Sequence, residues 1–440
     1  MKSLTSILLL FLLISFLPGK AQTHLFNFGQ RYDKDAVLID KTNFYSNDLS
    51  YGFDLNNKEE VEIIQHKKAF RKSVGFCTAE VPFYFSVKLP EGTYRVDLTF
   101  GHPKKPSQTS VKAEARRLML FNHELKAGDV CTKSFLVNVR SPQIDKERSI
   151  KLKARELNYM NWDKRLSLEF SGENVAIRSI AITPAQNYTT IFLAGNSTVT
   201  DQDCAPWASW GQMITPYFDE KVAIANYAES GESLASFKGA GRLDKVLSLM
   251  KPGDYLFIEF GHNDQKRKGE GIGPWLSFTD LLTEFVTRAR EAGGIPVLLT
   301  PTQRRSFNSE GQIELTHGEY PAAMRKVAAE LNVPLIDLNA QTKRLYEAWG
   351  PEASKKAFVH YAANTFPSQE KELADNTHFN TFGAHEIAQL VLQGVIDLDL
   401  EISRHITNFK APYQPENPSS FSDWNLVMSP RFVSIKPEGN

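Results

Sequence analysis

The chain has little cysteine and no excess of charge of either sign. Its 440 residues include three cysteines, Cys77, Cys131 and Cys204, which are too few to act as the main scaffold of a chain of this length. The first two could pair, and the odd number leaves at least one thiol unpaired. Lys and Arg total 51, as do Asp and Glu. Because no net field attracts a polyanion, we expect no nucleic-acid partner.

Long apolar runs are missing after the first residues. The run 4–17 follows Lys2 and precedes a Pro-Gly-Lys-Ala segment that ends at Ala21. This pattern is typical of a cleavable export signal, so we predict a signal peptide over residues 1–21 and a periplasmic or secreted protein. The run is shorter than the roughly 20 residues of a spanning helix, and no second one follows, so no membrane span is expected.

The length and the hydrophobic pattern indicate more than one domain. Between 26 and 184, short runs such as 84–89 and 94–100 alternate apolar and polar residues and are separated by turn-forming residues. We therefore predict a β-sandwich over residues 22–186. The last segment, 403–440, is rich in proline and is expected to be a tail ordered by its contacts rather than a domain.

Apolar strands alternate with amphipathic helical patterns between these two regions. This alternation predicts a parallel sheet covered by helices on both faces, a three-layer α/β domain over residues 187–402. The expected strands are 191–194, 222–226, 255–260, 295–300 and 333–338, and the expected helices include 242–250, 281–292, 320–331 and 384–395.

Polar residues follow three of these strands. In an open parallel sheet, ligands bind beyond the carboxyl ends of the strands. The first strand continues into Gly195-Asn196-Ser197-Thr198, the second into the segment 226–233, and the third into Gly261-His262-Asn263-Asp264. Asp375 and His378 lie three positions apart before the last helix, where we expect a turn.

These residues are the components of an acyl-transfer site. The hydroxyl of Ser197 becomes a nucleophile when an imidazole such as His378 removes its proton, and Asp375 would fix the tautomer of that imidazole. The backbone N–H groups of Ser197 and Gly231 and the side-chain amide of Asn263 would stabilise the oxyanion.

The same residues allow two other interpretations. Each residue taken alone has a structural role, such as a helix N-cap for Ser197 or an Asx turn for Asn263. Alternatively, a divalent ion could be held by two histidines and two aspartates, namely His262, Asp264, Asp375 and His378. That arrangement leaves Ser197 and Gly231 unexplained, so we predict neither a metal nor a cofactor.

The four segments resemble the four sequence blocks of the SGNH (GDSL-type) hydrolases. Their residues are most similar to those of the rhamnogalacturonan acetylesterases. The resemblance extends over about residues 190–399. It implies a flavodoxin-like fold with Ser197 as nucleophile, His378 as general base, Asp375 as its orienting carboxylate, and Gly231 and Asn263 completing the oxyanion hole. This chain has Asn196 where the first block usually has Asp.

The resemblance also suggests a substrate. The first domain looks like the galactose-binding-like sandwiches that accompany carbohydrate esterases, and Tyr159 and Trp162 are its candidate sugar-stacking or packing residues. Arg304 and Arg305 follow the fourth strand and are candidates for binding substrate carboxylates. We therefore expect hydrolysis of O-acetyl esters on a pectic polysaccharide, most specifically rhamnogalacturonan. The alternatives are an esterase of another acetylated glycan, such as xylan or peptidoglycan, an esterase of other acyl esters, and a non-catalytic polysaccharide-binding protein.

Overall fold

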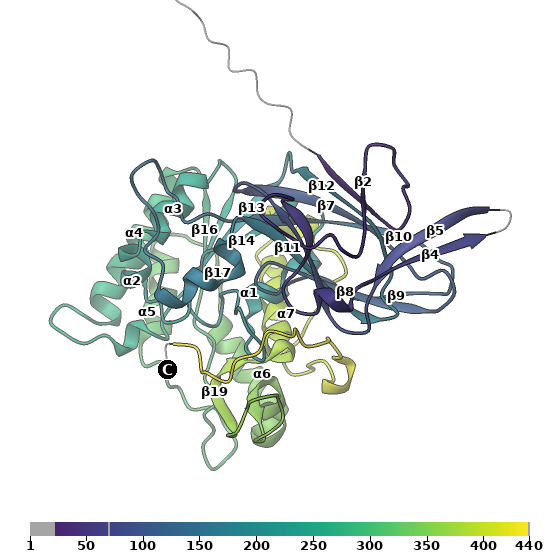
Figure 1. Ribbon diagram of the computed structural model, residues 1–440. Coiled ribbons are helices and arrows are strands. Elements are labelled where there is room, and N and C mark those ends of the chain that lie inside the picture. The colour runs from purple at the N-terminus through teal and green to yellow at the C-terminus, as the bar shows by residue number, and fades with distance from the viewer. Residues whose placement is uncertain (1–22, 69–70, 439–440) are drawn as a thin grey trace, which may run out of the picture.

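The structure, a computed structural model, describes residues 23–68 and 71–438. The signal peptide expected over residues 1–21 lies outside this described part. Figure 1 shows the first half of the chain as a β-rich body beside an α/β body formed by the second half. The boundary expected after residue 186 falls between strands β12 and β13.

The first body is a pair of mainly antiparallel sheets. In β7, Val96, Leu98 and Phe100 are buried while Arg95 and Asp97 pair on the outer face, which is the alternation of a strand with one face in a core. One sheet contains β10 (Cys131–Val139), β7 (Gly92–Phe100), β12 (Ile177–Pro184), β1 (His24–Phe28), β2 (Val37–Ile39), β4 (Glu62–Lys68) and β5 (Arg71–Thr78). The other contains β3 (Tyr51–Asp54), β6 (Phe83–Lys88), β11 (Arg165–Glu173), β8 (Ser107–Ala113) and β9 (Arg117–Leu125). Both sheets contribute side chains to one apolar core, so the predicted sandwich architecture is present.

Cys77 and Cys131 do not form the disulfide that the sequence left open. Cys77 of β5 lies opposite Ile177 of β12, Ile177 also lies opposite Phe100 of β7, and Phe100 lies opposite Cys131 of β10. Three strand spacings separate the two cysteines by about 14 Å, well beyond the Cα separation that a disulfide tolerates. All three cysteines are free thiols in the structure.

The second body is built on a parallel sheet with the strand order β14-β13-β15-β16-β17, which confirms the predicted flavodoxin-like fold. Along β13, Ile191 and Leu193 pack into one core and Phe192 and Ala194 into another, because helices cover both faces. The strands are β13 (Thr189–Gly195), β14 (Val222–Asn226), β15 (Tyr255–Glu259), β16 (Ile295–Leu299) and β17 (Leu335–Ile336).

Two sets of helices cover the faces of this sheet. One face is covered by α2 (Leu234–Gly239), α3 (Arg242–Leu249), α4 (Thr279–Glu291) and α5 (Tyr320–Glu330). The other is covered by α1 (Trp210–Met213), α6 (Leu338–Ala353) and α7 (Thr381–Asp397). Helix α6 was not among the expected helices. The strand expected over 333–338 stops early because Asp337 caps α6 by accepting a hydrogen bond from the Ala340 N–H.

The C-terminal segment contacts both bodies. The Lys112 ammonium of the sandwich donates to the Val427 carbonyl and to the Ser429 hydroxyl. Further on, Phe432 pairs with Ala205 of the α/β body as an isolated β-bridge. In residues 23–68 and 71–438, the helices are all too short or too polar to cross a bilayer.

Buried ion pairs join the two bodies. Asp201 of the α/β body binds Arg117 at 3.1 Å and Arg140 at 2.9 Å, both from the sandwich. Arg242 of α3 and Glu156 of the sandwich form a second pair at 2.6 Å, and neither side chain is exposed. Removing one partner of such a pair leaves a buried charge uncompensated, so these contacts fix the position of the sandwich on the α/β body.

Candidate active site

Ser197 lies in the turn that follows β13 and is almost completely buried. The side-chain oxygen of Asn196 accepts a hydrogen bond from the Thr198 N–H at 3.0 Å, which closes the turn. The Ser197 carbonyl accepts from the Gln202 amide at 2.8 Å and from the Ser209 hydroxyl at 2.7 Å. These bonds fix the backbone of Ser197, and Asn196 supplies the turn contact with an amide rather than a carboxylate.

Glu259, at the end of β15, supports this turn and was missed by the sequence analysis. Its carboxyl lies 2.8 Å from the Thr198 hydroxyl and accepts a hydrogen bond from the Trp210 indole at 2.6 Å. Burial raises the pKa of Glu259 to about 7, and the two hydrogen bonds only partly oppose that rise. In the sequence, Glu259 is simply the last residue of an apolar strand before Phe260 and Gly261. Its contacts with Thr198 and Trp210 are visible only in the structure.

Asp375 and His378 lie in β19 (Leu373–Phe379), which pairs with β18 (Phe358–Tyr361), rather than in a turn between elements. The register shifts between Phe358 and His360, so residues 375–378 form an irregular segment in the hairpin. There the Asp375 carboxylate accepts the N–H groups of Thr377 at 2.7 Å and His378 at 2.9 Å. This local turn within the hairpin explains how two residues three apart can face each other.

The structure brings Ser197, His378 and Asp375 into one line of hydrogen bonds. His378 Nε2 lies 2.8 Å from Ser197 Oγ, and His378 Nδ1 lies 2.8 Å from Asp375 Oδ2. Burial raises the pKa of Asp375, but the hydrogen bond and charge of His378 and the two backbone N–H groups outweigh it and lower the pKa to about 2. Asp375 is therefore ionised and able to hold the Nδ1 proton of His378.

The expected oxyanion donors lie in loops that are tied to the Ser197 turn. The Gln202 amide that holds the Ser197 carbonyl also lies 3.3 Å from the Ser230 hydroxyl, directly before Gly231. The Asn263 side-chain amide donates one hydrogen to the Glu232 carbonyl at 3.0 Å, and its second hydrogen is available for another acceptor. The backbone N–H groups of Ser197 and Gly231 make no hydrogen bond to the rest of the described chain. The two backbone N–H groups and the second amide hydrogen of Asn263 therefore have no acceptor in the described part of the chain.

Arg304 and Arg305 have different surroundings. Arg305 is 9% exposed, and its guanidinium donates to the Pro351 carbonyl, the Ser354 hydroxyl and the Asn376 side chain, so its donors serve the protein itself. Arg304 is half-buried, and its guanidinium lies 3.3 Å from the Thr316 hydroxyl and from His317 Nδ1 and 3.4 Å from the His262 carbonyl. Both guanidinium groups therefore contact the protein itself, and Arg304, the more exposed of the two, remains the candidate for a substrate anion.

The four alternative metal ligands make other contacts in the structure. Asp375 and His378 belong to the line of hydrogen bonds described above. The Asp264 carboxylate accepts hydrogen bonds from the N–H groups of Leu234 at 2.9 Å and Gly261 at 3.0 Å. These bonds hold the start of α2 against the loop that follows β15. The His262 ring packs edge-on against His317 with 4.5 Å between centroids. Burial and the nearby positive groups lower the pKa of His262 well below its usual range. In residues 23–68 and 71–438, no group of three or more His, Cys, Asp or Glu side chains is arranged to hold a metal ion.

The aromatic candidates of the sandwich pack at the junction with the α/β body. The Trp162 ring lies 6.3 Å from the Tyr227 ring and 5.0 Å from the Arg140 guanidinium, which favours the packing alternative. Tyr159 is half-buried, and burial and the Glu229 carboxylate raise the pKa of its hydroxyl.

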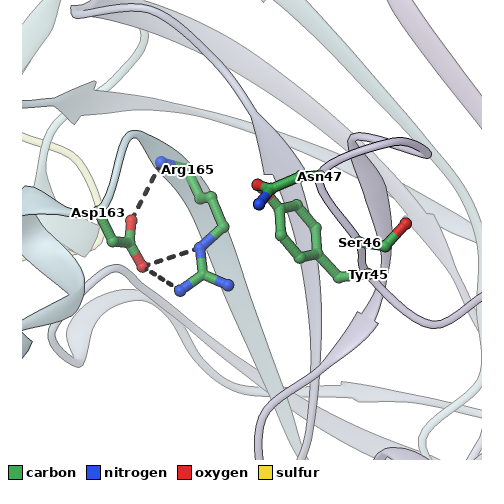
Figure 2. Close-up of a pocket in the computed structure, with 5 residues that line it drawn as sticks. All are labelled: Tyr45, Ser46, Asn47, Asp163 and Arg165. Atoms are coloured by element: carbon green, nitrogen blue, oxygen red, sulfur yellow. Dashed lines mark hydrogen bonds and ion pairs between the residues drawn. The ribbon is translucent and has the colours of Figure 1, made fainter.

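A separate pocket of about 440 Å³ lies on the sandwich. Figure 2 shows the Tyr45 ring beside Arg165, which Asp163 holds in an ion pair, whereas the Ser46 side chain points away from Arg165. The Arg165 guanidinium lies 4.8 Å from the centre of the Tyr45 ring. None of the Ser197 site residues lines this pocket, so it is no part of that site.

A serine, an imidazole and a carboxylate in line at the carboxyl edge of a parallel sheet are typical of a serine-dependent ester hydrolase. The model of the GDSL-like Lipase/Acylhydrolase family matches residues 193–385. The chain belongs to this family and is a carboxylic ester hydrolase.

Several proteins of Bacillus subtilis are similar to this chain. The rhamnogalacturonan acetylesterase RhgT is 47% identical over 222 residues, which are 50% of this chain and 94% of RhgT. The probable rhamnogalacturonan acetylesterase YesY is 34% identical over 49% of this chain and 96% of its own length. A crystal structure of YxiM matches 86% of this chain and 99% of that chain with 24% identity and a TM-score of 0.45. Nearly all of RhgT and YesY is thus matched by about half of this chain.

Proposed function

We propose that the protein removes O-acetyl groups from a pectic polysaccharide, most specifically rhamnogalacturonan, by a serine mechanism. The single observation that carries the mechanism is the 2.8 Å contact between His378 Nε2 and Ser197 Oγ, with Asp375 on the other ring nitrogen. The substrate rests on the 47% identity to a protein named as a rhamnogalacturonan acetylesterase.

The reaction proceeds in two halves. Ser197 Oγ attacks the acetyl carbonyl while its proton moves to His378 Nε2, and Asp375 stabilises the imidazolium. The oxyanion is held by the N–H groups of Ser197 and Gly231 and by the Asn263 amide. His378 then gives its proton to the departing sugar hydroxyl, which leaves an acetyl-enzyme. A water molecule, deprotonated by His378, attacks this ester, and collapse of the second tetrahedral intermediate releases acetate and restores the Ser197 hydroxyl.

Three cations beside the site support an acidic polysaccharide as the substrate. Burial and the positive charges of Arg304 and Lys436 lower the pKa of Lys266 to about 8. Lys266 also lies 3.4 Å from the Asn263 side chain, so this charge borders the oxyanion donors. Mutual repulsion among these groups is relieved when an anion binds between them. Lys436 pairs with the Asp375 carboxylate at 3.4 Å. We therefore propose that Lys266 and Arg304 bind the carboxylates of uronic acid residues next to the acetylated sugar.

The export signal expected over residues 1–21 would bring the enzyme to such a substrate outside the cytoplasm. N-terminal sequencing of the mature protein is expected to begin at Gln22, and fractionation of the cells that express it is expected to find it outside the cytoplasm. A full-length protein retained in the cytoplasm would refute this part of the proposal.

The central test is release of acetate from acetylated rhamnogalacturonan by the wild type and by Ser197→Ala. The wild type is expected to release acetate and the variant to lose activity by more than 10³-fold. Acetylated xylan, peptidoglycan and esters of longer acyl chains are compared in the same assay. Faster hydrolysis of one of these reassigns the substrate, whereas retention on pectin without hydrolysis or labelling by a serine-reactive phosphonate identifies a non-catalytic binding protein.

A further inference from the structure

The sandwich contacts the peptide group between Ser230 and Gly231. The Ser230 carbonyl oxygen accepts hydrogen bonds from Lys153 Nζ at 2.5 Å and from Arg155 Nη2 at 2.7 Å. Both cations come from the short segment at helix η2 (Ala154–Asn158) of the sandwich. This one carbonyl oxygen of the α/β body therefore lies against two positive charges from the other body.

Ion pairs hold the two cations in place. Arg155 binds the Glu229 carboxylate at 2.7 Å, and Lys153 lies 3.1 Å from the Glu232 carboxylate. Both carboxylates belong to the same loop as Ser230, and both are nearly buried. Glu438 of the C-terminal segment pairs with Arg155 at 2.5 Å and with Lys153 at 3.6 Å. Lys153 and Arg155 thus hold the loop at three residues, Glu229, Ser230 and Glu232, and we call this pair of cations the clamp.

A buried ion pair supports the segment that carries Lys153 and Arg155. The Glu156 carboxylate accepts the Lys153 backbone N–H at 2.8 Å and binds the Arg242 guanidinium with both oxygens at 2.6 Å. Both contacts come from Arg242 Nη2, and because this charged pair is fully buried, it fixes the start of η2 on helix α3. The side chains of Lys153 and Arg155 therefore project from a rigid segment rather than from a mobile loop.

Holding the Ser230 carbonyl sets the direction of the Gly231 N–H. A peptide unit is planar and trans, so its carbonyl and its N–H point in opposite directions. Gly231 has φ of +81°, a left-handed conformation that glycine adopts without strain, and a Cβ there would lie 3.1 Å from Lys153 Nζ. Cations on the carbonyl oxygen also polarise the peptide, which strengthens its N–H as a donor.

We propose that Lys153 and Arg155 are positioning residues that aim and polarise the Ser230–Gly231 peptide, so that the Gly231 N–H stabilises the oxyanion. The β-sandwich is then a part of the catalytic apparatus rather than a separable module. This inference rests on the proposed serine mechanism. It extends that mechanism because it makes the rate of the chemical step depend on two residues of the other body.

The test uses the full-length chain and 4-nitrophenyl acetate, a small neutral ester that needs no polysaccharide subsite. Lys153→Met and Arg155→Met are each expected to lower kcat about tenfold and the double variant about 10²-fold, with KM changed less than twofold, because only the transition state carries the oxyanion. Phosphonate labelling of Ser197 should slow in parallel. Arg155→Lys keeps a cation at the carbonyl and is expected to retain at least a third of the wild-type kcat.

The matched control is Arg148→Met. Arg148 also crosses from the sandwich to the α/β body, where it pairs with Asp244 at 3.2 Å, but it does not contact the loop of Gly231. Its kcat should equal that of the wild type. Thermal unfolding is measured for every variant, and if Arg155→Met does not fold, Arg155→Gln and Lys153→Gln take its place.

Two outcomes would overturn the inference. One is a folded double variant whose kcat stays within twofold of the wild type while Ser197→Ala is inactive, which leaves the serine mechanism intact and removes only the role of the clamp. The other is an equal loss in Arg148→Met, which would show a general effect of the contact between the two bodies. Activity remaining in Ser197→Ala would instead refute the proposed mechanism itself.

Discussion

His378 Nε2 lies 2.8 Å from Ser197 Oγ, although the two residues are 181 positions apart in the chain. Ser197 follows the end of β13, an inner strand of the parallel sheet, and His378 lies in the irregular segment of β19. Ser197 lies at the carboxyl edge of the parallel sheet, and the separate β18–β19 hairpin brings His378 to the same edge. The proposed chemistry depends on this contact.

Asp375→Asn is expected to lower kcat by about 10³–10⁴-fold with little change in KM. The amide has the same shape but cannot hold the Nδ1 proton of His378 as a carboxylate does, so the imidazole populates the wrong tautomer. Kinetics on 4-nitrophenyl acetate measure the effect. The control is Asp219→Asn, because Asp219 also pairs with a histidine, His405, at 3.0 Å but outside this site. A loss below tenfold for Asp375→Asn would argue against the triad.

Asn263→Ala is expected to lower kcat by about 10²–10³-fold, the usual effect of removing one oxyanion donor. Asn263 also donates to the Glu232 carbonyl, so thermal unfolding must be measured with the kinetics. A folded variant that loses less than threefold in kcat would exclude Asn263 as a donor to the oxyanion.

The layout of the α/β body could be predicted from the sequence because the patterns that define its strands and helices lie within short stretches of the chain. Each strand is an apolar run buried on both faces, and the polar residues at the strand ends are adjacent to those runs. The expected helices 242–250 and 320–331 differ from α3 and α5 by one residue at their ends. Helix α6 was missed because the apolar strand pattern before it was extended as far as residue 338, past its N-cap Asp337.

Contacts between distant segments could not be predicted in this way. The carboxyl of Glu259 and the cations of Lys153 and Arg155 act on loops up to 77 positions away, and no spacing rule links them. The adjacent Arg304 and Arg305 are equivalent in the sequence pattern, but Arg305 contacts the segment 351–354, whereas Arg304 contacts His317 and the His262 carbonyl. Pairing of this kind is decided by tertiary packing.

Arg304→Met and Arg305→Met are expected to have different effects. Loss of the Arg304 charge should raise KM for acidic acetylated pectin about tenfold and leave kinetics on neutral 4-nitrophenyl acetate unchanged, since a charged hydrogen bond contributes about 1.5–3 kcal/mol. Arg305→Met should lower the melting temperature and the activity on both substrates, because the Asn376 side chain, next to Asp375, loses one of its two partners and keeps only His360. Equal KM shifts in the two variants would contradict this division of roles.

One cysteine should react rapidly in the native protein. Cys131 is half-buried at the start of β10, whereas Cys77 is fully buried and burial raises the pKa of its thiol well above the usual range. Burial and the charge of Asp203 raise the pKa of Cys204 to about 11. Iodoacetamide at pH 8 should add one group quickly, and Cys131→Ser should remove it. Without reductant, the denatured protein should take up three groups, and uptake of only one would reveal a disulfide.

Glu259→Gln is expected to stabilise the protein increasingly as the pH rises. With its pKa near 7 when folded and 4.5 as the ordinary value, Glu259 retains its proton in the folded state between these pH values while the unfolded chain releases it. Stability of the wild type therefore falls from about pH 4.5 to pH 7 through this group, and the loss is complete above pH 7.

Glutamine keeps the shape and one acceptor for Trp210 but has no charge, so its advantage should grow by on the order of 3 kcal/mol between pH 4.5 and pH 8. Urea unfolding of both proteins at several pH values measures this difference. Other buried carboxyls, such as Glu229, are common to both proteins and cancel in the comparison. Glu310→Gln, in an exposed loop, serves as the control and should show no growth. An advantage of Glu259→Gln that is constant with pH would show that Glu259 is already ionised in the folded protein near pH 5.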